Sequence, residues 1–199
     1  MKTTGKILVF GGAALIMVLG LFGSQTAFAV APLPAQCPGS LGDYNIIEGT
    51  SASQTLNGTA GDDYIVGNGG SDTVKGNGGN DCVVTLGGAD KITTGSGNDV
   101  ILAGGGSNTV NAGNGNNKVY TGDGADTITT GSGDDVVEAG GGANKVTTGA
   151  GEDTVTTGDG ADNIKTQGGN DVITSGAGGD IIDGGTECDI IDGVTDDFA

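Results

Sequence analysis

Hydrophobic side chains recur once in every nine residues from residue 58 to residue 192. The eighth position of this unit is Ile or Val in all fifteen consecutive copies. The residues around it, as in Thr154-Val155-Thr156, alternate polar, apolar, polar, which is the period of a short β-strand. The six preceding residues are rich in Gly, so each unit predicts a tight turn followed by a strand with one inward side chain. Such strict self-similarity is typical of a solenoid.

The glycines make the turn possible, because Gly tolerates positive φ and close backbone approach. The fourth position is Gly in fourteen copies, and Glu187 is the exception. Two units return the chain to its starting direction, so one coil is expected to take eighteen residues and the strands of each face stack in parallel. We therefore predict an all-β, right-handed parallel β-roll with the Ile/Val column filling a narrow interior. The predicted turn glycines are Gly61, Gly70, Gly79, Gly88, Gly97, Gly106, Gly115, Gly124, Gly133, Gly142, Gly151, Gly160, Gly169 and Gly178.

The first 29 residues predict a secretory signal helix. Lys2 and Lys6 precede an apolar run over residues 7–22, and Ala27-Phe28-Ala29 offers small residues for cleavage. An uncleaved membrane anchor is the alternative, but sixteen residues interrupted by glycines are short for a membrane span. The signal predicts a protein that is secreted or held at the cell surface, with no membrane span after cleavage.

The remainder of the chain divides into three segments. Residues 30–57 contain two degenerate units that place Ile47 and Leu56 at the inward phase, and these are expected to cap the coil. Residues 58–192 form the fifteen repeats, and residues 193–199 form a C-terminal tail.

Acidic side chains occupy one fixed phase of the repeat. The sixth position is Asp in twelve copies and Asn in three. Without the signal, five lysines remain against 25 acidic residues, a net charge of about −20 that argues against nucleic acid or anionic lipid as a partner. Stacked coils would bring these carboxylates together, where they repel one another unless a cation lies between them. Carboxylate and carbonyl oxygens in a chain without His suit Ca²⁺ better than zinc or copper.

The unit from Thr121 to Thr129, with sequence TGDGADTIT, resembles the calcium-binding nonapeptide of the repeats-in-toxin (RTX) family. The resemblance implies a parallel β-roll in which the turns hold Ca²⁺ between successive coils through sixth-position side chains and turn carbonyls. The first edge of the roll would carry Asp63, Asp81, Asp99, Asn117, Asp135, Asp153, Asp171 and Asp189. The second edge would carry Asp72, Asp90, Asn108, Asp126, Asn144, Asp162 and Asp180. Pairing each turn with the next on its edge gives up to thirteen candidate Ca²⁺ sites, seven of them with Asp on both sides.

Three features depart from a uniform pattern. Asn108, Asn117 and Asn144 keep an oxygen but lose a charge, so they predict either weaker, emptier sites or neutral spacers that relieve repulsion. The first position is Thr, Ala or Ser in eleven copies, from Thr85 to Ser175, which affects the backbone geometry usual for that turn. The N-terminal signal also differs from the C-terminal export signal of many members of the family.

The three cysteines permit at most one internal disulfide. Cys82 and Cys188 would lie almost six coils apart, roughly 28 Å at about 4.8 Å per coil, which is too far for a bond. Cys37 with Cys82 is the favoured pair. Cys188 would then be free or would link two molecules.

The two outward faces differ. One bears an apolar stripe that includes Tyr64, Val84 and Leu102, which predicts contact with residues 30–45, with a second copy or with a cell-surface component. The other is rich in Thr, including Thr127 and Thr129, and resembles the ice-binding surface of some β-solenoid antifreeze proteins, although lysines interrupt it. Calcium-dependent ice binding is therefore an alternative function.

The residues for catalysis are scarce. After signal removal the chain has no His, Arg or Trp, so the common general bases and oxyanion clamps are lacking and no enzyme is expected. The function predicted from the sequence is a secreted, calcium-binding β-roll that serves as a structural, adhesive or surface-associated module, with folding coupled to Ca²⁺ binding.

Overall fold

The computed structural model describes residues 32–192 and 194–196 of the 199-residue chain. The predicted signal segment and most of the predicted tail lie outside the described residues. In the part of the chain that the structure describes, no helix is long and apolar enough to cross a membrane.

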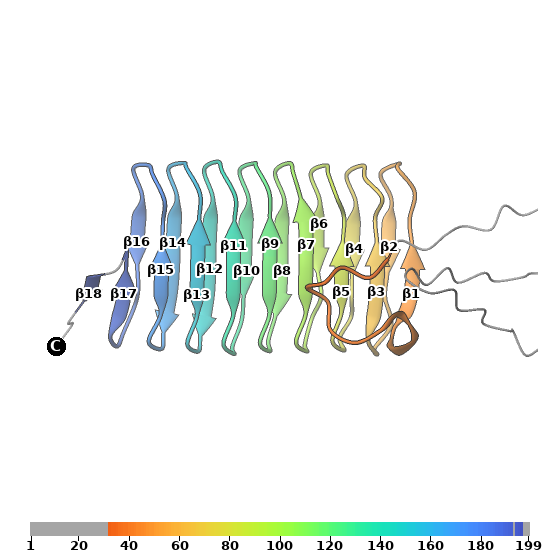
Figure 1. Ribbon diagram of the computed structural model, residues 1–199, viewed down its shortest axis with the longest axis horizontal. Helices are drawn as coiled ribbons and strands as arrows, with labels where there is room; N and C mark the ends of the chain where they lie inside the picture. The colour runs from red at the N-terminus through yellow and green to blue at the C-terminus, as the bar shows by residue number, and fades with distance from the viewer. Residues whose placement is uncertain (1–31, 193, 197–199) are drawn as a thin grey trace, which may run out of the picture.

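The described chain winds into an elongated coil made of two facing sheets (Figure 1). The first sheet has ten strands, β1 (Asn45–Glu48), β3 (Asp63–Val66), β5 (Cys82–Val84), β7 (Val100–Gly104), β9 (Lys118–Thr121), β11 (Val136–Ala139), β13 (Thr154–Thr157), β15 (Val172–Thr174), β17 (Asp189–Ile191) and β18 (Val194–Asp196). The second sheet has eight, β2 (Thr55–Asn57), β4 (Thr73–Lys75), β6 (Lys91–Thr93), β8 (Thr109–Gly113), β10 (Thr127–Thr130), β12 (Lys145–Ala150), β14 (Asn163–Gly168) and β16 (Ile181–Asp183). A short 3₁₀ turn, η1 (Leu41–Asp43), precedes β1.

Successive strands in each sheet are parallel and offset by one coil. Val137 lies opposite Val155 in the first sheet, and Ile128 lies opposite Val146 in the second, so eighteen residues make one turn. The two units without the glycine signature pair in the same way, with Ile47 opposite Ile65 and Leu56 opposite Val74. Only β18 runs antiparallel to its neighbour among the described strands. The predicted all-β solenoid with eighteen residues per coil is confirmed.

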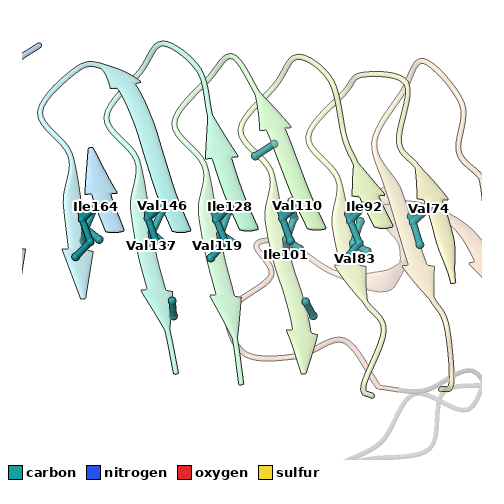
Figure 2. Packing of buried hydrophobic residues seen from close by; sticks show 14 of the residues in the cluster. Val74, Val83, Ile92, Ile101, Val110, Val119, Ile128, Val137, Val146 and Ile164 are labelled. Atoms are coloured by element: carbon teal, nitrogen blue, oxygen red, sulfur yellow. The ribbon is translucent and has the colours of Figure 1, made fainter. Parts of the chain in front are cut away.

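The interior is a column of aliphatic side chains that meet between the sheets (Figure 2). Eighth-position residues such as Ile101 and Val119 are fully buried. The first position also faces inward, because the strands continue one residue further than the sequence analysis expected: Ala103 and Thr130 are buried in β7 and β10. Over most of the coil each unit thus contributes two inward side chains, whereas the sequence analysis expected one.

Six of the seven first-position threonines are buried with their hydroxyl groups hydrogen-bonded, and the exception is Thr121, whose Oγ1 has no partner among the described residues. The Oγ1 atoms of Thr85, Thr94, Thr130, Thr148, Thr157 and Thr166 each donate to the carbonyl of the residue eighteen positions later, at 2.9–3.4 Å. A buried hydroxyl without such an acceptor would destabilise the fold. The departure from Gly therefore supplies an inner row of hydrogen bonds between coils.

Residues 32–44 cross the outer face of the first sheet and cover its N-terminal strands (Figure 1). Cys37 is joined to Cys82 of β5 by a disulfide with a Cα–Cα distance of 5.8 Å. The Tyr64 hydroxyl donates to the Pro32 carbonyl at 3.1 Å. Leu33 and Leu41 pack against the apolar cluster on this face, which contains Tyr64, Cys82 and Val84.

This cover confirms the first alternative for the apolar stripe at Tyr64, Val84 and Leu102, which is contact with the segment at residues 30–45. Tyr64 is 1% exposed and Val84 is 8% exposed, and Leu102 is partly buried in the same cluster. The apolar stripe is used within the chain, so it is not available to a second copy or to a surface component. Cys188, by contrast, is a free and exposed cysteine at the other end of the coil.

The fourth-position glycines are required by the stacking of the turns. Gly88 has a φ of +129°, and a Cβ placed on it would lie 1.8 Å from the Gly70 carbonyl oxygen in the preceding coil. The same approach recurs along both edges. Gly61 and Gly178 are exceptions among the predicted turn glycines, since neither has a positive φ, and Glu187 adopts the left-handed conformation at φ +84° in place of a glycine.

We expect Gly88→Ala to reduce the free energy of unfolding by about 2 kcal/mol or more, because it combines a disfavoured φ with a backbone clash. The measurement is denaturant unfolding at saturating Ca²⁺. The matched control is Gly179→Ala, since a Cβ there has no neighbour within 4 Å. Equal stability of the two variants would contradict this account of the turns.

Candidate metal centre

The sixth-position side chains form two columns, one along each edge of the coil. Each residue begins a strand or directly precedes one, at the point where the turn enters the sheet. On both edges these residues are 2% exposed or less, with the exception of the partly exposed Asp180. The structure therefore stacks all fifteen candidate residues in the two rows that the sequence predicts.

One oxygen of each side chain links neighbouring coils. Asp81 Oδ1 accepts the backbone N–H of Asp63 at 3.0 Å, and Asp99 Oδ1 accepts that of Asp81 at 2.8 Å. The pattern continues along the first edge to Asp189 and along the second edge from Asp72 to Asp180, always eighteen residues apart. These bonds hold each turn against the turn before it.

The second oxygen of most of these carboxylates is buried without a hydrogen-bond donor. Among the described residues this is true of Oδ2 in Asp72, Asp81, Asp90, Asp99, Asp126, Asp135, Asp153, Asp162 and Asp171. A buried anionic oxygen with no partner is strongly unfavourable. These atoms therefore need either a proton or a cation.

Nearby threonine hydroxyls do not meet this need. Burial raises the pKa of Asp99, Asp135 and Asp153, and the hydroxyl groups of the neighbouring Thr94, Thr130 and Thr148 act in the opposite direction. However, each hydroxyl has one proton, and in all three residues it is directed to a carbonyl of the next coil.

The three sixth-position Asn residues show which groups surround the second terminal atom of the side chain, the atom that is Oδ2 in Asp. In Asn144 this atom is Nδ2, which donates to the carbonyls of Gly140 and Gly142, the second and fourth residues of the same turn. In an Asp copy the corresponding carboxylate oxygen faces a turn of the same length and register, where backbone carbonyls offer further oxygens. A group of oxygens with no proton among them is the ligand set that Ca²⁺ prefers.

Burial raises the pKa of several of these carboxyl groups. Desolvation raises the pKa of Asp81 to about 7 against the lowering effect of the Asp63 N–H, and the neighbouring Asp99 adds to the rise. Desolvation likewise raises the pKa of Asp153 to about 6 and raises those of Asp99 and Asp135. The columns are thus poorly compatible with negative charge unless a cation compensates it.

No three His, Cys, Asp or Glu side chains converge within the described residues. A cation in these columns would have carboxylate oxygens of neighbouring coils as ligands, and backbone carbonyl oxygens of the turns would complete its coordination. The donor set is composed of oxygen throughout, which fits Ca²⁺ and not zinc or copper.

Two structural features of the turns were missed from the sequence. The fifth position forms an outer row on the first edge, in which Asp62, Asn80, Asn98, Asn116 and Asp134 each accept the backbone N–H of the fifth-position residue in the next coil. Asp63 also differs from the other carboxylates, because its Oδ2 accepts the N–H of Thr59 at 2.6 Å. The recurrence of Asn and Asp at the fifth position in alternate units was the available signal for the outer row.

Fold and site together define a calcium-binding β-solenoid. Four copies of the RTX calcium-binding nonapeptide repeat match residues 48–81, 84–119, 120–155 and 156–193. These matches span more than half of the chain, so the protein belongs to the RTX calcium-binding nonapeptide repeat family. Neither the curated proteins nor the solved structures gave a match.

In metal-depleted buffer we expect acidification from pH 8 to pH 5 to stabilise the coil. The folded-state pKa values of Asp81 and Asp153 are raised to about 7 and about 6, so the folded state binds protons that the unfolded state has lost. This stabilisation is fully present below the unfolded pKa near 3.8 and is lost as the pH rises through 6 to 7.

The measurement is the β content from far-ultraviolet circular dichroism across this pH range in high salt, which screens repulsion between exposed acids. The same titration at saturating Ca²⁺ is the control, and there the trend should vanish or reverse because protons compete with the ion. A β content that falls on acidification without metal would refute the assignment.

Proposed function

We propose that this protein is a secreted or surface-associated structural module that folds when its edges bind Ca²⁺. The observation that carries the proposal is the row of buried carboxylate oxygens without donors along both edges. They lie in the interior of the turns and cannot be hydrated there. Calcium binding therefore contributes directly to folding.

The rest of the structure offers little to replace the ion. The interior holds only Ile, Val, Ala, Thr and Ser side chains over most of its length, and each aliphatic residue contributes about 2 kcal/mol by burial. Backbone ordering costs about 1–2 kcal/mol for every residue, and the 44 glycines increase that cost. Each bound cation adds stability that grows with the logarithm of the free Ca²⁺ concentration.

Export would then control folding. Inside the cell Ca²⁺ is scarce, so the acidic columns favour an extended chain that can be translocated. Outside the cell Ca²⁺ is abundant, and the chain can close into the coil. The apolar segment at residues 7–22 and the disulfide between Cys37 and Cys82 both support an oxidising, extracellular location.

The coil also has properties suited to a spacer or adhesive surface. Its two sheets extend along the coil, and the exposed Val172, Ile181 and Ile190 belong to β15, β16 and β17 near the C-terminal end (Figure 1). Within the described residues, the candidate functional groups that we identify lie in the calcium columns. We therefore assign the module no catalytic role.

We expect the purified protein to have low β content in excess chelator and to gain full β content on addition of Ca²⁺. Far-ultraviolet circular dichroism measures this change, and light scattering during the same titration separates a soluble binder from an assembling one. Mg²⁺ at the same concentration is the control, since it demands a smaller octahedral site and should be much less effective. Full β content in excess chelator would contradict coupled folding.

Calcium-dependent ice binding is a second candidate because the second sheet keeps its outward residues in strict register. Thr109 lies opposite Thr127, and Thr129 lies opposite Thr147. Lys91 and Lys145 interrupt the first of these rows, and Lys165 interrupts the second. If this face binds ice, thermal hysteresis should be measurable with Ca²⁺ and absent with chelator; its absence in both conditions would exclude the second candidate.

A further inference from the structure

The three sixth-position asparagines use both ends of the side-chain amide. Their Oδ1 atoms accept the backbone N–H of the preceding coil, as the carboxylates do. Their Nδ2 atoms donate to the second- and fourth-position carbonyls of their own turn at 2.8–3.3 Å. The two ends cannot be exchanged, because only the oxygen can accept an N–H and only the nitrogen can donate to a carbonyl.

These contacts leave the buried amides satisfied. Asn108, Asn117 and Asn144 are 2% exposed or less, and each Nδ2 has two protons and two carbonyl acceptors. In the Asp copies the second atom is an oxygen, which lacks those protons and in most copies has no donor. The hydrogen bonding at this position of the turn is therefore satisfied with Asn and, in most copies, unsatisfied with Asp.

We infer that the amide nitrogens of Asn108, Asn117 and Asn144 take the place of calcium in their turns, so that these turns close without a metal. This inference rests on the proposed function, since it states where the ion binds and where it does not. Each Asn fills the place of one ion in its own turn, so at most ten of the thirteen gaps between stacked turns remain for Ca²⁺. Seven of these have Asp on both sides.

The seven gaps with Asp on both sides form separate groups. On the first edge they lie between Asp63 and Asp99 and between Asp135 and Asp189, and on the second edge between Asp72 and Asp90 and between Asp162 and Asp180. The middle of the coil, around β8 and β9, is held by amides. Calcium dependence is thus concentrated towards the two ends.

The experiment compares two reciprocal substitutions with one truncation. Asn117→Asp removes the two amide bonds to Gly113 and Gly115, so it should bind at least one more Ca²⁺ than the wild type and melt about 2 to 4 °C lower in chelator. Asp153→Asn supplies a new amide opposite the carbonyls of its own turn. It should bind at least one fewer Ca²⁺ and melt about 2 to 4 °C higher in chelator.

Asp153→Ala is the matched control. It removes the same charge but cannot donate to the turn and cannot accept the N–H of Asp135. It should also bind fewer ions, but it should melt lower than the wild type in chelator. A purely electrostatic effect of removing the charge would instead make the Asn and Ala variants behave alike.

Ion number is measured by equilibrium dialysis, and stability by thermal melting. If the chelated proteins show no melting transition, the Ca²⁺ concentration at half-maximal folding replaces it, and Asp153→Asn should need less Ca²⁺ than Asp153→Ala. Binding of more than ten ions by the wild type, an unchanged ion number in Asn117→Asp, or equal stability of the two Asp153 variants would overturn the inference. A wild type that binds no Ca²⁺ would refute the proposed function instead, and the melts in chelator would still decide the role of the amides.

Discussion

The structure depends on the contact between one sixth-position side chain and the backbone of the preceding coil. In this contact Oδ1 of a carboxylate or amide accepts an N–H eighteen residues earlier, and the contact recurs along both edges. It brings successive turns so close that only glycine fits at the fourth position in nearly every coil. The same contact buries the other carboxylate oxygen, which creates the need for a cation. Stacking of the coils and affinity for metal are therefore two results of one geometry.

The two ends of the coil are stabilised by different means. At the N-terminal end, residues 32–44 cover the apolar stripe of the first sheet and are fixed to β5 by a disulfide. Towards the C-terminal end no such cover lies on the described strands, and Ile181 is 66% exposed. Antiparallel pairing of β18 with β17 ends the first sheet, whereas β16 leaves the edge of the second sheet unpaired among the described residues. Stability at this end must rely more heavily on the metal columns.

Much of this architecture could be predicted from the sequence because the repeat is local and strict. The Ile/Val phase fixed the inward column, and the Asp phase fixed the edges, since a period of eighteen residues leaves little freedom in register. The first position was harder to place. Thr is common on the outer side of strands, so only the observed extension of strands such as β10 shows that Thr130 faces inward. The role of Asn144 could not be predicted either, because the orientation of its amide depends on the positions of the Gly140 and Gly142 carbonyls, which the sequence does not give.

The disulfide has a consequence for how the chain is threaded. Because the units are nearly identical, a coil that slips by eighteen residues keeps aliphatic residues inside and Asp or Asn at the edges, so slipped and native arrangements are close in energy. Slippage by one coil would put Tyr64 or Val100 where Cys82 stands, and Cys37 would then have no sulfur to join. A single covalent bond at the third strand of the first sheet therefore selects one threading of an otherwise repetitive polymer.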